Sequence, residues 1–298
     1  MKLFYIILIF LTNLFANPSN NPLRGNHYNK ILTKSFLEQS CDMGVSNYCT
    51  KLGDMYRDGK NVAQDFNKAA FYFKKACYND VSPDLRACAN LGLMYSYGHG
   101  VKKSYPIALK LFKEACNNGV SSDMWACSDL GDMYLYGKGV DKSFFRAREL
   151  YDMACAHWAL GCYKLGNMYF YGRGARKNYR KAAALYREGC NDKKIDISHP
   201  GACNNIGYMY YVGLGVPRNF KKAIKYYRRA CRLNNPDGCD NLGLMYENGQ
   251  GVPKNNEKAI VFYNKACQLK SDTACREYNR LDRKLDYIDS VTRIDTNE

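Results

Sequence analysis

The chain contains an interval between two cysteines that is 28 residues long and occurs six times, and no other feature constrains its fold as much. The distance from one interval to the next varies from 35 to 41 residues. Self-similarity with a period of about 20–50 residues is typical of a solenoid. We therefore predict rigid units joined by connectors that accept insertions. The intervals begin at Cys49, Cys88, Cys127, Cys162, Cys203 and Cys239.

The first half of the interval that starts at Cys88 has a helical pattern. Leu91, Met94 and Tyr95 follow that cysteine at the spacing of one buried helix face. Gly92 interrupts this face, and a glycine at the same place recurs in all six intervals although it costs about 1 kcal/mol against alanine inside a helix. We expect the backbone of a neighbouring helix to approach closely there.

The second half begins after a turn, Gly98-His99-Gly100-Val101, because glycine favours the left-handed conformation at helix C-termini. Ser104 is then the expected N-cap of a second helix. A small residue, Ala108, precedes the aromatic Phe112 by four positions, a pattern that lets two helices pack closely. The unit is therefore an αα-hairpin, and the chain is predicted to be an all-α solenoid of stacked hairpins.

The ends of the chain depart from the repeat. Residues 1–16 have one lysine followed by an apolar run and are predicted to be a secretory signal peptide, with retention as an anchor the alternative. Residues 17–41 are expected to be a linker and a capping helix, in which Thr33 replaces the small residue. Six repeats are assigned to 42–275, and a C-terminal capping helix and tail to 276–298. No other stretch is apolar enough to span a membrane.

The fourteen cysteines form an even set in a chain with an export signal, which indicates seven disulfides. Pairing across the 28-residue interval would leave Cys41 and Cys275 without partners. Pairing across the short connectors uses every cysteine and is favoured. The favoured bridges are Cys41–Cys49, Cys77–Cys88, Cys116–Cys127, Cys155–Cys162, Cys190–Cys203, Cys231–Cys239 and Cys267–Cys275.

Metal, cofactor and nucleic-acid chemistry have little support in the sequence. The four histidines are isolated and no Cys-x-x-Cys occurs, so we expect no metal, and no cofactor motif is present. The Gly-x-Gly segments follow helices and lack the Gly-Lys-Ser/Thr ending of phosphate-binding loops. Lysines and arginines are scattered along the second helices without one dense run, which favours a solvated surface over a nucleic-acid site, although the net charge of +16 keeps an anionic partner as an alternative.

The first helices carry a second set of positions, two, five and nine residues after the cysteine, on the face opposite the apolar stripe. Their mixture of amide, acid and tyrosine is typical of a recognition surface, with an ordinary solvated surface as the alternative. Asp129 and Asp132 could also serve acid–base chemistry. The candidate groove residues are Asn90, Leu93, Tyr97, Asp129, Asp132, Tyr136, Lys164, Asn167, Tyr171, Asn205, Tyr208, Val212, Asn241, Leu244 and Asn248.

The pattern LGxMYxxGxGV followed by NxxKAxxYYxxAC, with a cysteine at each end, resembles the Sel1-like repeat, a relative of the tetratricopeptide repeat. With its signal peptide and paired cysteines, the chain looks like a member of the Helicobacter cysteine-rich protein family. The resemblance covers about Cys41 to Cys275. It implies a right-handed αα-superhelix with disulfide-bridged hairpins, secreted or periplasmic.

Two functions follow as expectations. The first is a secreted scaffold whose concave groove binds a peptide, a protein or a cell-wall component, with a host or cell-wall partner and a monomeric state. The second, implied by the resemblance alone, is a weak β-lactamase or penicillin-binding hydrolase. No catalytic residue can be assigned for it, because the chain has no Ser-x-x-Lys and no Lys-Thr-Gly.

Overall fold

The structure is a computed structural model that describes residues 33–117, 124–191 and 198–295. Every regular element in these ranges is a helix. The predicted signal peptide and most of the linker lie outside them. The chain divides into two compact units, 1–84 and 85–298, a division that no feature of the sequence predicted.

Each repeat supplies two helices, as expected for an αα-hairpin. The first unit contains α2 (Lys34–Asp42), α3 (Ser46–Asp58) and α4 (Phe66–Cys77). In the second unit the first helices of the repeats are α5 (Leu85–Tyr97), α7 (Met124–Tyr136), α9 (Ala159–Tyr171), α11 (Pro200–Val212) and α13 (Pro236–Asn248). Its second helices are α6 (Tyr105–Asn117), α8 (Phe144–Cys155), α10 (Tyr179–Gly189), α12 (Phe220–Arg232) and α14 (Asn256–Gln268), and α15 (Asp272–Asp295) follows them.

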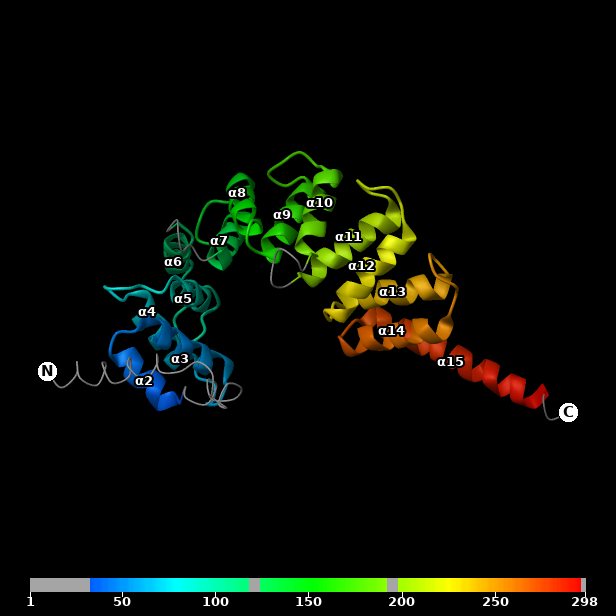
Figure 1. Ribbon diagram of the computed structural model, residues 1–298, viewed down its shortest axis with the longest axis horizontal. Helices are drawn as coiled ribbons and strands as arrows, with labels where there is room; N and C mark the ends of the chain where they lie inside the picture. Colours follow the sequence, from blue (N-terminus) through cyan, green and yellow to red (C-terminus); the bar gives the residue numbers. More distant parts are fainter. Residues whose placement is uncertain (1–32, 118–123, 192–197, 296–298) are drawn as a thin grey trace, which may run out of the picture. The chain divides into compact units, whose positions relative to one another are not determined.

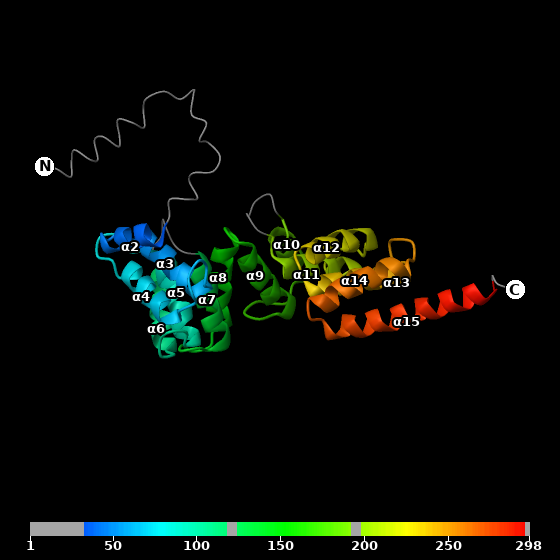
Figure 2. The same cartoon turned by 90° about the horizontal axis from the view of Figure 1, so that it is seen from below.

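Within the second unit, each first helix packs against the second helix that follows it, and each second helix packs against the next first helix (Figure 1). The first helices α9, α11 and α13 also contact one another in order, as α5 contacts α7. Figure 2 shows the helix α15 extending from the last hairpin, α13–α14. The side of the stack formed by the first helices is therefore shared by successive repeats.

The recurring glycine of the first helix accommodates a ring. A Cβ atom on Gly131 would lie 2.5 Å from Cε1 of Tyr151, and one on Gly92 would lie 2.7 Å from Cε1 of Phe112. Both rings are fully buried. We predicted that the backbone of a neighbouring helix would approach this glycine. That prediction was wrong, since the group that contacts the glycine is the aromatic side chain of the second helix in the same hairpin. The same arrangement joins Gly53 to Phe73, Gly166 to Tyr186, Gly207 to Tyr227 and Gly243 to Tyr263.

The predicted turn and cap residues have the expected roles. Gly172 is the left-handed C-cap of α9, with φ 72°. Asn178 is the N-cap of α10 and accepts a hydrogen bond from the Lys181 backbone N–H. Thr33 differs from its predicted role: it is the N-cap of the short helix α2 rather than a packing position within it. Corresponding N-caps are Asp65, Ser143, Asn219 and Asn255.

The disulfides follow the connector scheme, and pairing across the 28-residue interval was wrong. Six bridges have sequence separations of 7 to 13 residues, and Cys77 and Cys88 are disulfide-bonded as well. Each described bridge joins the end of one helix to the start of the next, at the opposite end of the hairpin from the Gly-x-Gly turn. The six are Cys41–Cys49, Cys116–Cys127, Cys155–Cys162, Cys190–Cys203, Cys231–Cys239 and Cys267–Cys275.

Candidate functional site

Two neighbouring pockets lie along the first helices α5, α7 and α9, where the candidate groove residues are concentrated. The first pocket, between the α5–α6 and α7–α8 hairpins, has a volume of about 210 Å³. The second, between α7–α8 and α9–α10, has a volume of about 270 Å³. Asp132 lines both. The predicted residues among the two linings are Leu93, Tyr97, Asp129, Asp132, Tyr136, Lys164, Asn167 and Tyr171.

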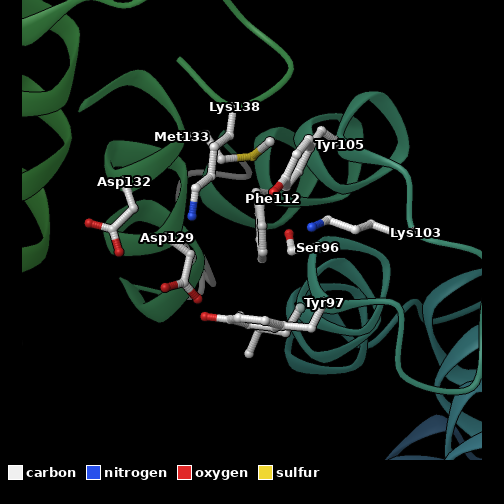
Figure 3. Close-up of a pocket in the computed structure, with 10 residues that line it drawn as sticks. Ser96, Tyr97, Lys103, Tyr105, Phe112, Asp129, Asp132, Met133 and Lys138 are labelled. Atoms are coloured by element: carbon white, nitrogen blue, oxygen red, sulfur yellow. The ribbon is translucent and has the colours of Figure 1, made fainter. Parts of the chain in front are cut away.

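In the first pocket, acidic and aromatic groups face each other across the cavity. Figure 3 shows the Tyr97 hydroxyl pointing toward the Asp129 carboxylate, while the Lys138 side chain reaches toward the same side from the α7–α8 turn. Lys103 lies 4.9 Å from the centre of the Tyr105 ring, and its ammonium group lowers the pKa of that phenol. The pocket therefore offers both charges beside an aromatic surface.

In the second pocket, Asp132 is held by two partners. Its Oδ1 accepts a hydrogen bond of 2.6 Å from the Tyr151 hydroxyl, and its Oδ2 lies 2.8 Å from the Lys164 ammonium nitrogen. Burial, with the nearby Asp132 charge, raises the pKa of Tyr151, so that its hydroxyl stays protonated and donates. One repeat further, the buried Tyr186 hydroxyl donates to Asn167 at 2.6 Å.

Positions five and two form a ladder between repeats. Asp132, at position five of its helix, pairs with Lys164 at position two of the next helix. Asn205, again at position two, donates to Asn167 at 3.4 Å. Asn241, at position two of α13, departs from this pattern, since it donates at 3.0 Å to Asn204, at position one of α11. These polar groups therefore hold neighbouring first helices together, and Asp132, Lys164 and Asn167 also line the second pocket.

In α5, α7 and α9, position nine is the most exposed of the three. Tyr97, Tyr136 and Tyr171 are 65%, 61% and 58% exposed. Each lies beside the middle residue of its Gly-x-Gly turn. The ring of Tyr97 stacks on that of His99, with ring centres 5.7 Å apart. Lys138 lies 5.4 Å from the centre of the Tyr136 ring, and Arg173 lies 5.4 Å from the centre of the Tyr171 ring. These three tyrosines are the side chains best placed to contact a ligand.

The structure places the remaining candidates elsewhere and adds residues that the sequence reasoning missed. Asn90, Asn205, Tyr208, Val212, Asn241, Leu244 and Asn248 line neither pocket. The missed lining residues are Ser96, Lys103, Tyr105, Phe112, Met133, Leu135, Lys138, Tyr151, Tyr163, Met168 and Arg173. A signal for two of them was present, since the middle of the Gly-x-Gly turn is Lys138 or Arg173 in consecutive repeats.

The described residues of the two pockets include no serine hydroxyl hydrogen-bonded to a base, and the one cluster of potential metal ligands in the described ranges is not available to an ion. Ser96 shares the first pocket with Lys103, but none of the described hydrogen bonds links a serine hydroxyl to a base in either pocket. Cys155, Cys162 and Glu188 have potential ligand atoms within 4.8 Å of one another. The two sulfurs are joined in a disulfide, so neither is available as a thiolate ligand.

Comparison with known proteins gives repeat proteins throughout. A Sel1 repeat protein from Oxalobacter formigenes is 27% identical, with 78% of this chain and 92% of that chain covered and a TM-score of 0.70. A protective antigen present in uropathogenic Escherichia coli strains is 26% identical, with 84% of this chain covered and a TM-score of 0.53, and this chain spans only 60% of it. Helicobacter pylori cysteine rich protein B is 31% identical over 45% of this chain and 93% of that one, with a TM-score of 0.37. No curated protein matches the chain.

The family model of the Sel1 repeat matches six segments that together make up well over half of the chain. They coincide with the six hairpins from α3–α4 to α13–α14. The segments are 46–81, 85–120, 126–157, 159–193, 200–235 and 236–271. The chain belongs to the Sel1-repeat family.

Proposed function

We propose that this protein is an exported binding scaffold that holds an extended peptide segment of a partner protein along α5, α7 and α9. Sel1 repeats generally mediate protein interactions, which supports a binding role. The observation that carries the proposal is the pair of adjoining pockets with one exposed tyrosine per repeat, Tyr97, Tyr136 and Tyr171.

The location follows from the cysteines. All fourteen are disulfide-bonded, and such bridges persist in oxidising compartments outside the cytoplasm. No helix in the described part of the chain is long and apolar enough to cross a membrane. Export through the apolar segment 1–16 would bring the chain into such a compartment, the periplasm or the medium.

The geometry suits a peptide because the recognition groups recur with the repeat. Tyrosines offer large, rigid surfaces at a small cost in conformational entropy, and they are common anchors at interfaces. Asp129 and Lys138 add opposite charges at the first pocket, which could read side chains or the amide groups of a backbone. Asp132 is engaged by Tyr151 and Lys164, so we assign it to the groove floor.

The test is selection of peptides from a displayed library on the oxidised protein, followed by affinity measurements on variants. Tyr136→Ala and Tyr171→Ala should each weaken a selected peptide by about ten- to hundredfold, as expected for aromatic anchors. Phe145→Ala is the matched control, because Phe145 is 53% exposed on α8 and lines neither pocket. Equal losses in all three variants, or no enriched peptide, would contradict the proposal.

The hydrolase expectation has a separate readout. Turnover of the chromogenic cephalosporin nitrocefin that follows the protein through purification and disappears in Asp132→Ala would favour a β-lactamase. No observation in the two pockets favours that function over peptide binding.

A further inference from the structure

The Gly-x-Gly turns of the second unit carry an unusual share of the charge. The five turns at 98–104, 137–143, 172–178, 213–219 and 249–255 contain nine lysines and arginines and one acid, Asp141, a formal charge of +8 in a chain whose total is +16. The five connectors at the other end of the hairpins, 117–126, 156–161, 191–202, 232–238 and 268–274, contain four cations and five acids, a formal charge of −1. Charge is therefore segregated to the turn edge.

One cation recurs immediately before the N-cap of each second helix. We call these five residues the turn row. In four of the five repeats the cation lies over the ring of the residue two positions later. The distances to the ring centres are 4.9 Å for Lys103 over Tyr105, 4.7 Å for Lys142 over Phe144, 5.9 Å for Lys177 over Tyr179 and 5.5 Å for Arg218 over Phe220. The turn row is Lys103, Lys142, Lys177, Arg218 and Lys254, all exposed.

Each turn packs against the first residue of the preceding second helix, which connects the row from repeat to repeat. A Cβ on Gly139 would lie 2.7 Å from Cβ of Tyr105, the ring-bearing residue of the preceding repeat. Gly251 approaches Phe220 in the same way, at 2.7 Å. Arg148 adds a hydrogen bond of 3.1 Å to the Gly174 carbonyl of the following turn. The same glycine contact joins Gly174 to Phe144 and Gly215 to Tyr179.

From this arrangement we infer that the turn row binds a linear acidic polysaccharide, one anionic group per repeat. Cations that recur once in each stacked repeat match a polymer that carries repeated sulfates or carboxylates. Contact with a ring restrains each side chain while its charged group stays in solvent, so less conformational entropy is lost on binding. Asp141 is the one acid in the five turns and does not offset their nine cations. Lys103 also lines the first pocket, so this edge adjoins the groove proposed for peptides, whereas Lys142, Lys177, Arg218 and Lys254 line neither pocket.

Two other polyanions fit the edge less well. Single-stranded nucleic acids are held by bases stacked on open aromatic rings. The four rings beside the turn row each already have a cation of the row over them. Membrane surfaces are bound with apolar side chains inserted between headgroups. The apolar residue that follows each Gly-x-Gly is instead partly buried, namely Val101, Val140, Ala175, Val216 and Val252.

The test measures binding of heparin, the probe, to the full-length oxidised chain by calorimetry over a range of NaCl concentrations. The row variant combines Lys142→Glu, Lys177→Glu and Arg218→Glu. The control variant combines Lys113→Glu, Lys225→Glu and Arg232→Glu, three exposed cations of second helices away from the turns. Both variants lower the formal charge by six. Glutamine replacements at the three row positions test the same contacts without charge reversal, and circular dichroism verifies the helix content of each variant.

The row variant should bind heparin at least tenfold more weakly, and the control variant within about twofold of the parent. The slope of log Kd against log salt should fall by about two to three, since each neutralised charge of a nucleic-acid polyanion contributes about 0.7–0.9. Equal losses in both variants would show diffuse attraction and overturn the inference. Tighter, row-dependent binding of a DNA duplex, or of vesicles with equal parts phosphatidylcholine and phosphatidylglycerol, would also overturn it.

Discussion

His199 should make the stability of the second unit depend on pH. It is the N-cap of α11, where its Nδ1 accepts a hydrogen bond of 3.3 Å from the Ala202 backbone N–H. Its ring stacks on Tyr163, with ring centres 4.2 Å apart. Burial, with the nearby Lys164 charge, lowers the pKa of His199 from 6.5 to about 4. Protonation would also replace the accepting lone pair with a donor, and the cap would be lost.

The sign and size follow from linkage. In the unfolded chain His199 takes up a proton near pH 6.5, whereas in the folded chain it does so only near pH 4. Its stabilising effect is therefore complete above pH 6.5 and is lost as the pH falls from about 6.5 to about 4. The full difference corresponds to about 3 kcal/mol, and partial exposure of the ring reduces this to about 2–3 kcal/mol.

The assay is urea unfolding followed by circular dichroism between pH 7 and pH 4, with an NMR titration of the His199 ring. His199→Asn keeps an accepting N-cap but does not titrate, so its stability should change less over this range than that of the parent. His157→Asn removes an exposed imidazole and controls for the substitution itself. A His199 pKa near 6.5 in the folded protein, or equal pH dependence of the parent and His199→Asn, would refute the reasoning.

Two further predictions concern the packing and the bridges. Gly131→Ala should destabilise the protein by about 1–2 kcal/mol in urea unfolding, because its Cβ would lie 2.5 Å from the Tyr151 ring and the strain exceeds the gain in helix propensity. In a Tyr151→Ala background the same change should be neutral or stabilising, and a persistent cost there would argue against the ring contact. Replacing Cys155 and Cys162 together by alanine should cost about 2–3 kcal/mol for a bridge of separation 7, and a loss well below 1 kcal/mol would contradict the chain-entropy argument.

The regular features of the fold were predictable because they repeat within one chain. The cysteine interval, the turn glycines and caps such as Asn178 depend on contacts between residues close in sequence. Side-chain pairing between repeats was not predictable in this way. Asp132 and Lys164 are 32 residues apart, and their contact depends on how one hairpin stacks on the next. The glycine partner was missed for a related reason, since a missing side chain does not show whether a backbone or a ring fills its space.

The candidate site was predicted in its position more than in its roles. Eight of the fifteen positions chosen on the first helices line the two pockets, but the pattern could not separate the exposed Tyr136 from the engaged Asp132. The two residues differ in their exposure and partners. Tyr136 is exposed, whereas Asp132 accepts a hydrogen bond from the Tyr151 hydroxyl of the second helix, a contact that the helical pattern does not reveal. Lys138 and Arg173 were missed because the turns were interpreted only as chain reversals.

The connector bridges also determine how the protein would respond to a mechanical load. Each described disulfide links the two ends of its connector covalently. A pulling force would therefore be carried by the disulfide, and the connector residues would not be extended. Only the 28-residue segments between bridges could then lengthen, hairpin by hairpin. Under an optical tweezer the oxidised chain should show a shorter final extension than the reduced chain, by the summed contour length of its connectors.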